Sequence, residues 1–243
     1  MIISHSKKFI FIHIPKCAGT SVRRSIEDYF CENNMERDLI SFRNYHWGKN
    51  NDRNVDLAWK IKHKKLTEKQ IVFYKKFNQH SPYKCIESAF KKENINLDDY
   101  FKFSFFRNPW ERRVSQYFFG KQQAKKNRPF FLRNKYYQES FKNFALSPPP
   151  LHQYESIVNS RGKIGVDFIG RFDNLQEDFD YVCERIEIPK MELSHRNKTD
   201  HEHYMEYYDD ELMNSFALEY ADDIEVFNRL PIKRRENPAC GSQ

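Results

Sequence analysis

Two short segments of the sequence combine positive charges, hydroxyl groups and turn residues in a way that suits the binding of an anion. The first, KCAGTS at residues 16–21, lies between an apolar run and a segment with apolar residues at helical spacing. This pattern predicts a strand, a tight loop and a helix, whose N-terminal backbone N–H groups attract anions. Lys16 adds a full charge and Gly19 permits close backbone approach. The hydroxyls of Thr20 and Ser21 add donors, so we expect this loop to hold a phosphate or a sulfate group.

The second segment follows the apolar run 101–106, which predicts a strand buried on both faces. The strand is followed at once by Arg107, and Ser115 lies two helical turns further along the chain. A guanidinium binds phosphate or sulfate through paired hydrogen bonds, so a backbone reversal after Arg107 would bring both side chains to one anion. The alternative is that Arg107 pairs with Glu111 and that Ser115 is an incidental surface residue.

The loop at residues 16–21 differs from the P-loop of nucleotide-binding proteins. The pattern G-x-x-x-x-G-K-[ST] places its Lys after the second Gly, whereas Lys16 precedes Gly19. Nucleotide hydrolases usually end another strand in an acidic residue that helps to hold Mg²⁺, whereas here that position is Arg107. Two alternatives stay open: a nucleotide-dependent, kinase-like transferase, and a purely structural loop in which Lys16 is solvated and Thr20 is an N-cap.

The composition indicates one folded domain with an anionic partner. The chain has 243 residues, and its 16% of aromatic side chains supply burial that a disordered segment lacks, which excludes global disorder. Lys and Arg number 41 against 34 Asp and Glu, and the net charge of +7 favours a negatively charged partner. No run approaches the ~20 apolar residues of a membrane span, and no signal peptide is recognised at the start, so we expect a cytoplasmic protein. The five cysteines are scattered and form no C-x-x-C, which argues against a disulfide framework and a zinc ribbon.

The order of the predicted elements indicates an α/β fold, a single domain with a central, mainly parallel sheet flanked by helices. We expect the domain to span residues 1–230, with an irregular insertion of small core contribution at about 33–79 and a polar, basic tail at 231–243. The expected strands are 8–14, 101–106 and 167–172. A helix is expected after each anion segment and at 67–77, 81–92, 137–146, 175–186 and 209–227.

The segments FIHIPKCAGTSV and FKFSFFRNPWERRVSQYFF resemble the two cofactor-binding motifs of sulfotransferases, particularly of the branch that contains carbohydrate sulfotransferases. The resemblance continues in VDFIGRFDNLQEDF and LSHRNKTDHEHYMEYYDDEL and covers most of the chain, with 33–79 and 121–158 unmatched. It implies a P-loop-like sulfotransferase architecture. It also implies that the donor is 3′-phosphoadenosine 5′-phosphosulfate (PAPS), used without a metal, and that the acceptor is a hydroxyl, expected on a carbohydrate. The acceptor itself is not readable, because the unmatched segments are expected to form its pocket.

The resemblance also assigns roles to individual residues. The loop for the 5′-phosphosulfate would consist of Lys16, Cys17, Ala18, Gly19, Thr20 and Ser21. The 3′-phosphate would be bound by Arg107 and Ser115, and the loop around Lys198 and Thr199 looks like the one that closes over the cofactor.

The reaction of this family explains why these residue types are needed. Sulfuryl transfer proceeds in line through a loose transition state, so the protein positions groups and neutralises charge on the leaving phosphate, a task that suits Lys16. The acceptor hydroxyl must lose a proton, and a neutral His can take it. We expect His80 to be this base, because QHSPYKCIESAF resembles the family segment in which a His precedes the helix that leads to the strand before Arg107. His13 is the reserve candidate, and a structural role for His80 is the alternative.

Other interpretations have less support. A zinc site at His195, His201 and His203 is not expected, because no thiolate or carboxylate set lies at a recognised spacing. Cys17 could have a lowered thiol pKa beside Lys16, but no nucleophile motif accompanies it, and a packing role is the simpler reading. A non-enzymatic protein that binds nucleic acid or an acidic glycan would explain the charge but not the two anion segments, so no nucleic-acid partner is expected.

The basic tracts 60–65 and 121–133 are solvated faces or the rim of a glycan site. Aromatic residues near the second tract could stack on sugar rings or belong to the core; they are Phe130, Phe131, Tyr136 and Tyr137.

Overall fold

The computed structural model describes residues 1–35, 39–42, 67–126, 128, 131, 135–149, 151–193 and 201–232. A five-stranded sheet in the order β3-β1-β2-β4-β5 forms its centre. The strands are β1 (Ile2–Ser4), β2 (Phe9–Ile12), β3 (Leu39–Ser41), β4 (Phe101–Phe106) and β5 (Phe168–Arg171). Strands β2, β4 and β5 run parallel, and β1 pairs antiparallel with both β2 and β3. The expected α/β fold is therefore confirmed. The two strands that precede the predicted anion segments, β2 and β4, are neighbours in the parallel part of the sheet.

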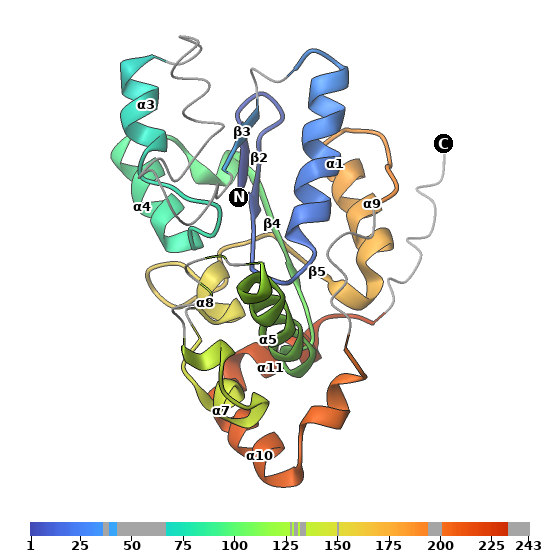
Figure 1. Cartoon of the computed structure of the whole chain (residues 1–243). Coiled ribbons are helices and arrows are strands. Elements are labelled where there is room, and N and C mark those ends of the chain that lie inside the picture. Colours follow the sequence, from blue (N-terminus) through green and yellow to red (C-terminus); the bar gives the residue numbers. More distant parts are fainter. Residues whose placement is uncertain are drawn as a thin grey trace.

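Helices cover both faces of this sheet, which explains why β2 and β4 are apolar runs and not alternating sequences. Helices α1 (Gly19–Glu32) and α9 (Leu175–Arg185) lie on one face, and α3 (Glu68–Tyr74) and α4 (Tyr83–Lys92) lie on the other (Figure 1). All four residues of β2 are at most 1% exposed. This packing fixes where each parallel strand ends, and so where the following loops begin.

The antiparallel edge of the sheet was not anticipated from the sequence. Strands β1 and β3 have only three residues each, which is too short for a periodic pattern. The expectation that residues 33–79 contribute little to the core is wrong. Ile40, Phe42 and Phe73 from this segment are at most 5% exposed and belong to the main hydrophobic core.

The remaining helices form a lobe beyond the carboxyl ends of the parallel strands (Figure 1). They are α5 (Pro109–Lys125), α7 (Phe141–Leu146), α8 (Gln153–Ile157), α10 (Asp210–Glu219) and α11 (Ala221–Arg229). Short 3₁₀ helices are η2 (Leu97–Asp99), η3 (Lys135–Tyr137), η4 (Phe172–Asn174) and η5 (Tyr204–Tyr207).

Two helices in this lobe differ from their expected form. The helix expected at 137–146 begins only at Phe141, because Ser140 caps it by accepting a hydrogen bond from the N–H of Asn143. The helix expected at 209–227 is broken at Tyr220, which leaves helical geometry with φ −107° and ψ 23°. In the first turn after this break, Asp223 is directed toward the N-terminus of α8.

Candidate active site

The first anion segment forms the turn between β2 and α1, as its sequence predicts. Lys16 and Ala18 adopt left-handed backbone conformations, with φ of 68° and 56°. Ala18 is the N-cap of α1 and has no side-chain oxygen, so no side chain at this position caps the helix. Gly19, Thr20 and Ser21 form the first turn of α1. The positive end of the helix dipole therefore faces the loop.

Gly19 is required for a reason that the sequence did not reveal. A Cβ built on Gly19 would lie 2.0 Å from Cδ2 of His13, so the imidazole of His13 occupies the space that any other side chain would need. The sequence suggested that Gly19 permits close approach of a ligand. The structure adds a second reason for a glycine, which is the close packing of the His13 ring. His13 itself is 4% exposed and stacks on Phe11, with ring centroids 5.8 Å apart.

Lys16 is a half-buried cation next to a second cation. Burial and the nearby charge of Arg107 lower the pKa of Lys16 to about 8. Its Nζ lies 4.1 Å from the ring centroid of Phe119, and its backbone carbonyl accepts a hydrogen bond of 3.4 Å from Nη1 of Arg107. No carboxylate of the described residues forms an ion pair with Lys16. Two cations held together in this way are stabilised when an anion lies between them.

Arg107 follows the last residue of β4 and is 9% exposed. Arg107 forms the ion pair with Glu111 that the sequence allowed as an alternative. Nη2 of Arg107 lies 2.5 Å from Oε1 of Glu111. The ring of Phe172 covers the guanidinium at 4.1 Å. Within the described residues, Nε of Arg107 is buried and has no hydrogen-bond partner. Such a buried donor is the kind of group that a bound phosphate satisfies. Ser115 is 2% exposed on α5.

His80 lies in the turn before α4 and contacts the carboxyl end of β2. Its Nδ1 is 2.8 Å from the backbone oxygen of His13, and the two imidazole centroids are 4.7 Å apart. A carbonyl can only accept, so Nδ1 of His80 carries the proton and donates it, and Nε2 is left as the acceptor. Burial lowers the pKa of His80 to about 4, which keeps the ring neutral at neutral pH.

The thiol of Cys17 is inert, and the alternative of a reactive, low-pKa cysteine is wrong. Cys17 is 1% exposed, and burial raises its pKa to about 11. Its Sγ donates to Oε1 of Gln153 at 3.1 Å. Cys17 can therefore contribute to an anion site only through its backbone.

Some predicted residues lie outside the described part of the chain, namely Lys198 and Thr199 of the closing loop, together with His195. Among the residues that the structure describes, no group of three or more His, Cys, Asp or Glu side chains is arranged to hold a metal.

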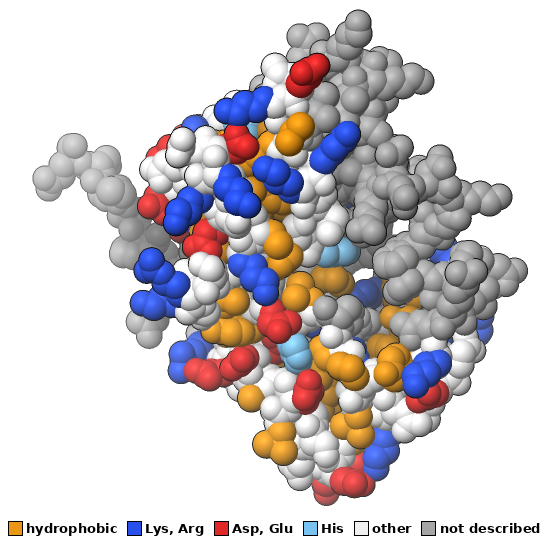
Figure 2. All heavy atoms as spheres, turned by 90° about the vertical axis from the view of Figure 1, so that its left-hand side faces the viewer, with side chains coloured by type: hydrophobic (Ala, Val, Ile, Leu, Met, Phe, Trp, Pro, Cys, Tyr) orange, Lys and Arg blue, Asp and Glu red, His pale blue; other side chains and the backbone are white. Residues whose placement is uncertain are grey.

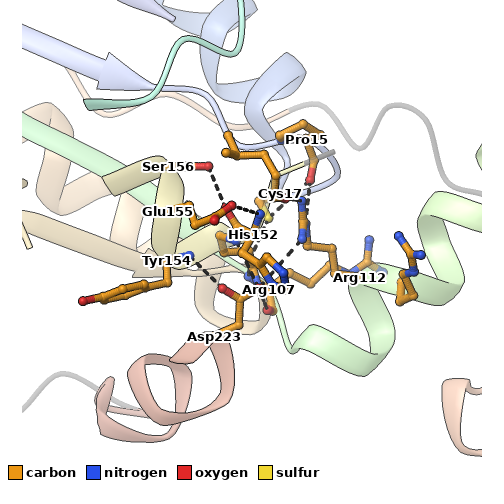
Figure 3. A network of polar contacts seen from close by, with 12 residues as sticks. Pro15, Cys17, Arg107, Arg112, His152, Tyr154, Glu155, Ser156 and Asp223 are labelled. Atoms are coloured by element: carbon orange, nitrogen blue, oxygen red, sulfur yellow. Dashed lines mark hydrogen bonds and ion pairs between the residues drawn. The ribbon is translucent and has the colours of Figure 1, made fainter. Parts of the chain in front are cut away.

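The site also contains residues that the sequence analysis did not select. Gln153, Arg112 and Asp223 join the anion segments to α8 and α11. Figure 3 shows Arg112 and Asp223 in this network. Phe119 lies against Lys16, and Phe172 covers Arg107. Gln153 and Asp223 lie outside the segments that carry the resemblance, whereas Arg112, Phe119 and Phe172 lie within them. In both cases only the tertiary contacts reveal the role of the side chain.

A mixed, mostly parallel α/β sheet whose adjacent strands β2 and β4 lead into cationic loops is the arrangement of a P-loop-like fold. The chain matches the family model described as "Sulfotransferase family" over residues 1–228. It therefore belongs to the sulfotransferase family, whose enzymes generally use PAPS as the sulfuryl donor. It is also similar to an uncharacterized protein of Archaeoglobus fulgidus, with 36% identity over 97 residues, which is 39% of this chain and 73% of that protein. In the described residues, no helix has the length and apolar character needed to cross a membrane.

Proposed function

We propose that this sulfotransferase transfers a sulfuryl group from PAPS to a carbohydrate hydroxyl, with Lys16 neutralising the leaving phosphate and His80 accepting the proton. One observation supports the donor site most directly. The loops at the carboxyl ends of β2 and β4 bring Lys16 and Arg107 together, where the charge of one lowers the pKa of the other. Without a bound anion this arrangement costs free energy, and a donor with two anionic ends would reverse that cost.

The residues present fit the two ends of the donor. Lys16 and the N-terminus of α1 would hold the 5′-phosphosulfate, because they combine a cation with helix N–H groups. Arg107 would use its buried Nε for the 3′-phosphate, and Ser115 its hydroxyl. Lys198 and Thr199 would close over the donor, as the sequence resemblance implies.

The proposed chemistry needs one base and one stabilising cation. Nε2 of His80 takes the proton of the acceptor hydroxyl while the acceptor oxygen forms a bond to sulfur. The bond between that sulfur and the 5′-phosphate oxygen breaks, and the ammonium of Lys16 neutralises the charge that appears on the phosphate. No residue is oxidised or reduced, and no metal is required in this scheme.

A carbohydrate acceptor is supported by the sequence resemblance and by the apolar surface beside Lys16. The half-buried ring of Phe119 adjoins Lys16, and the ring of Phe131 lies 5.9 Å from it. Aromatic rings of this kind can pack against sugar faces. Tyr137 is a core residue, since its ring fills the space beside Gly120. Phe130 lies outside the described residues.

One face of the molecule lacks the charge pattern that a nucleic-acid-binding module needs. On the face shown in Figure 2, the described Lys and Arg side chains are interspersed with Asp and Glu and form no continuous basic stripe. The kinase-like alternative lacks the acidic residue that usually ends the second strand, because Arg107 follows β4. A cytoplasmic location stays a prediction.

Ligand-induced stabilisation tests the proposed donor. We expect 3′-phosphoadenosine 5′-phosphate (PAP) to raise the melting temperature without Mg²⁺, and ATP to raise it much less with or without Mg²⁺. A ligand at about 100 times its Kd adds about 2.7 kcal/mol, which a thermal-shift assay detects readily. Stabilisation by ATP only in the presence of Mg²⁺ would favour the kinase-like alternative, and stabilisation by neither nucleotide would contradict the donor assignment.

A substitution at Arg107 tests the 3′-phosphate site separately. We expect Arg107→Ala to weaken PAP binding strongly but to leave the already weak binding of adenosine 5′-phosphosulfate, which lacks the 3′-phosphate, nearly unchanged. Isothermal titration of both ligands measures this difference. Equal losses for the two ligands would show that Arg107, through Glu111 and Lys16, only supports the fold of the loop.

A further inference from the structure

A buried side-chain amide joins the two loops that contain the anion segments, the loop around residues 16–21 and the loop that begins at Arg107. We call these the two anion loops. Gln153, the first residue of α8, is 0% exposed. Its Oε1 accepts from Sγ of Cys17 at 3.1 Å and from the backbone N–H of Arg107 at 3.0 Å, and its Nε2 donates to the carbonyl of Arg107 at 2.9 Å. A backbone N–H can only donate and a carbonyl can only accept, so these contacts determine the orientation of the amide. The side chain of Gln153 thus binds the backbone N–H and the backbone carbonyl of Arg107, and it also binds Cys17 in the middle of the other loop.

A buried carboxylate holds this amide in place. Asp223 is 0% exposed, and its two oxygens accept the backbone N–H groups of Gln153 at 3.0 Å and Tyr154 at 2.7 Å. Its Oδ2 also lies 3.9 Å from Nη1 of Arg112, whose Nε donates to the carbonyl of Pro15 at 3.0 Å. Figure 3 shows Arg112 between the loop of Pro15 and the carboxylate of Asp223. A second connection therefore runs from the first anion loop to α8.

These contacts anchor the residues on either side of Lys16. Pro15 is held through its carbonyl, Cys17 through its thiol, and the carbonyl of Lys16 itself faces Arg107. Because the charges of Lys16 and Arg107 repel each other, loops without such connections would move apart. The network therefore sets the separation of the two cations before any ligand binds.

We propose that Gln153 is a positioning residue that fixes the distance between the two anion loops, with Asp223 as its support. This inference rests on the proposed function, because it assumes that both loops bind one donor molecule. The 5′-phosphosulfate and the 3′-phosphate of PAPS are attached to one ribose, so their separation varies little. Loops that drift apart can satisfy only one end of such a ligand, and affinity and turnover both fall.

The test combines PAP binding with the chemical reactivity of Cys17. Gln153→Ala removes the amide, whereas Gln153→Glu keeps the acceptor oxygen and loses the donor to Arg107. Asp178→Asn is the matched control, because Asp178 is also a buried carboxylate, 5% exposed, that accepts a backbone N–H, that of Arg171, at 2.6 Å. We expect PAP affinity to fall tenfold or more, up to about a hundredfold, in Gln153→Ala, less in Gln153→Glu and little in the control.

Peptide-resolved thiol labelling separates positioning from general stability. Cys17 and Cys183 are both buried, but only Cys17 contacts Gln153. In Gln153→Ala we expect Cys17 to react at least about tenfold faster with a thiol reagent, while the rate at Cys183 stays unchanged. A global loss of stability would accelerate both cysteines equally.

Each outcome decides the proposal. Unchanged PAP affinity in Gln153→Ala would overturn it, and so would equal acceleration at Cys17 and Cys183, which would make Gln153 a general scaffold residue. If Gln153→Ala does not fold, the same two measurements on Gln153→Glu apply. A wild-type protein that does not bind PAP would contradict the proposed donor, whereas selective acceleration at Cys17 in that case would still establish that Gln153 joins the loops.

Discussion

Replacing Lys16 by Ala is expected to lower kcat by about a hundredfold or more while weakening PAP binding much less. The charge on the bridging oxygen of the donor develops mainly in the transition state, so one lost charge-assisted donor costs about 3 kcal/mol there. Single-turnover rates and isothermal titration measure the two effects separately. Equal losses in binding and in turnover would contradict this role and would assign Lys16 to ground-state binding.

Lys8 provides a matched control for this substitution. It also has a left-handed backbone conformation, with φ 51°, and its ammonium lies 4.9 Å from the ring centroid of Tyr100. Lys8 precedes β2, however, and so lies at the amino ends of the parallel strands, whereas Lys16 lies at their carboxyl ends. Lys8→Ala should leave kcat unchanged. A comparable loss of kcat in both variants would point to a general effect on the sheet.

The pH dependence should also report on Lys16. Because its pKa is about 8 in the free enzyme, the required ammonium is lost as the pH rises through that value, and kcat/KM should fall on the alkaline side. A bound anion favours the charged form and raises the pKa, so the corresponding limb of kcat should lie at higher pH. In Lys16→Arg the side chain stays charged, and this limb should disappear from both profiles.

The sequence predicted the parallel part of the fold because its signals there are local. An apolar run followed by a loop and a helix occurs at both β2 and β4, and the strand expected at 101–106 has those bounds in the structure. The antiparallel strands could not be predicted, since three-residue strands show no period and depend on the neighbour that they pair with. Ile40 and Phe42 are therefore core residues that no periodic pattern in the sequence indicated.

The same distinction applies to the candidate site. Lys16 and Arg107 each lie in the short connection between an apolar run and a helical segment, so the sequence alone indicated them. Gln153 and Asp223 lie 46 and 116 residues beyond Arg107, each outside the segments that carry the resemblance, and their contacts arise only when α8 and α11 pack together. The sequence indicated Gly19 as a residue that permits close approach of a ligand, and the packing of the His13 ring against it could only be seen in three dimensions.

Removing His80 is expected to reduce kcat by ~10² to 10⁴ while PAP binding survives. His80→Asn is the informative variant, because its amide N–H can still donate to the carbonyl of His13, whereas the acceptor nitrogen Nε2 is lost. His5→Asn is a suitable control, since His5 is a half-buried His with a lowered pKa that bonds the hydroxyls of Tyr74 and Tyr100 away from the anion loops. The control should retain full turnover with a glycan acceptor.

The acidic limb of the rate profile gives a second, independent measure of the role of His80. In the free enzyme the base titrates near its pKa of about 4, so kcat/KM should fall only as the pH drops toward that value. The negative charge of a bound donor favours the protonated ring and raises the pKa, so the acidic limb of kcat should lie at higher pH. Both limbs should vanish in His80→Asn. If turnover is unchanged in that variant, His80 is not the base, and His13 becomes the residue to test. A folded variant that has lost PAP binding would instead make His80 a structural support of the loop.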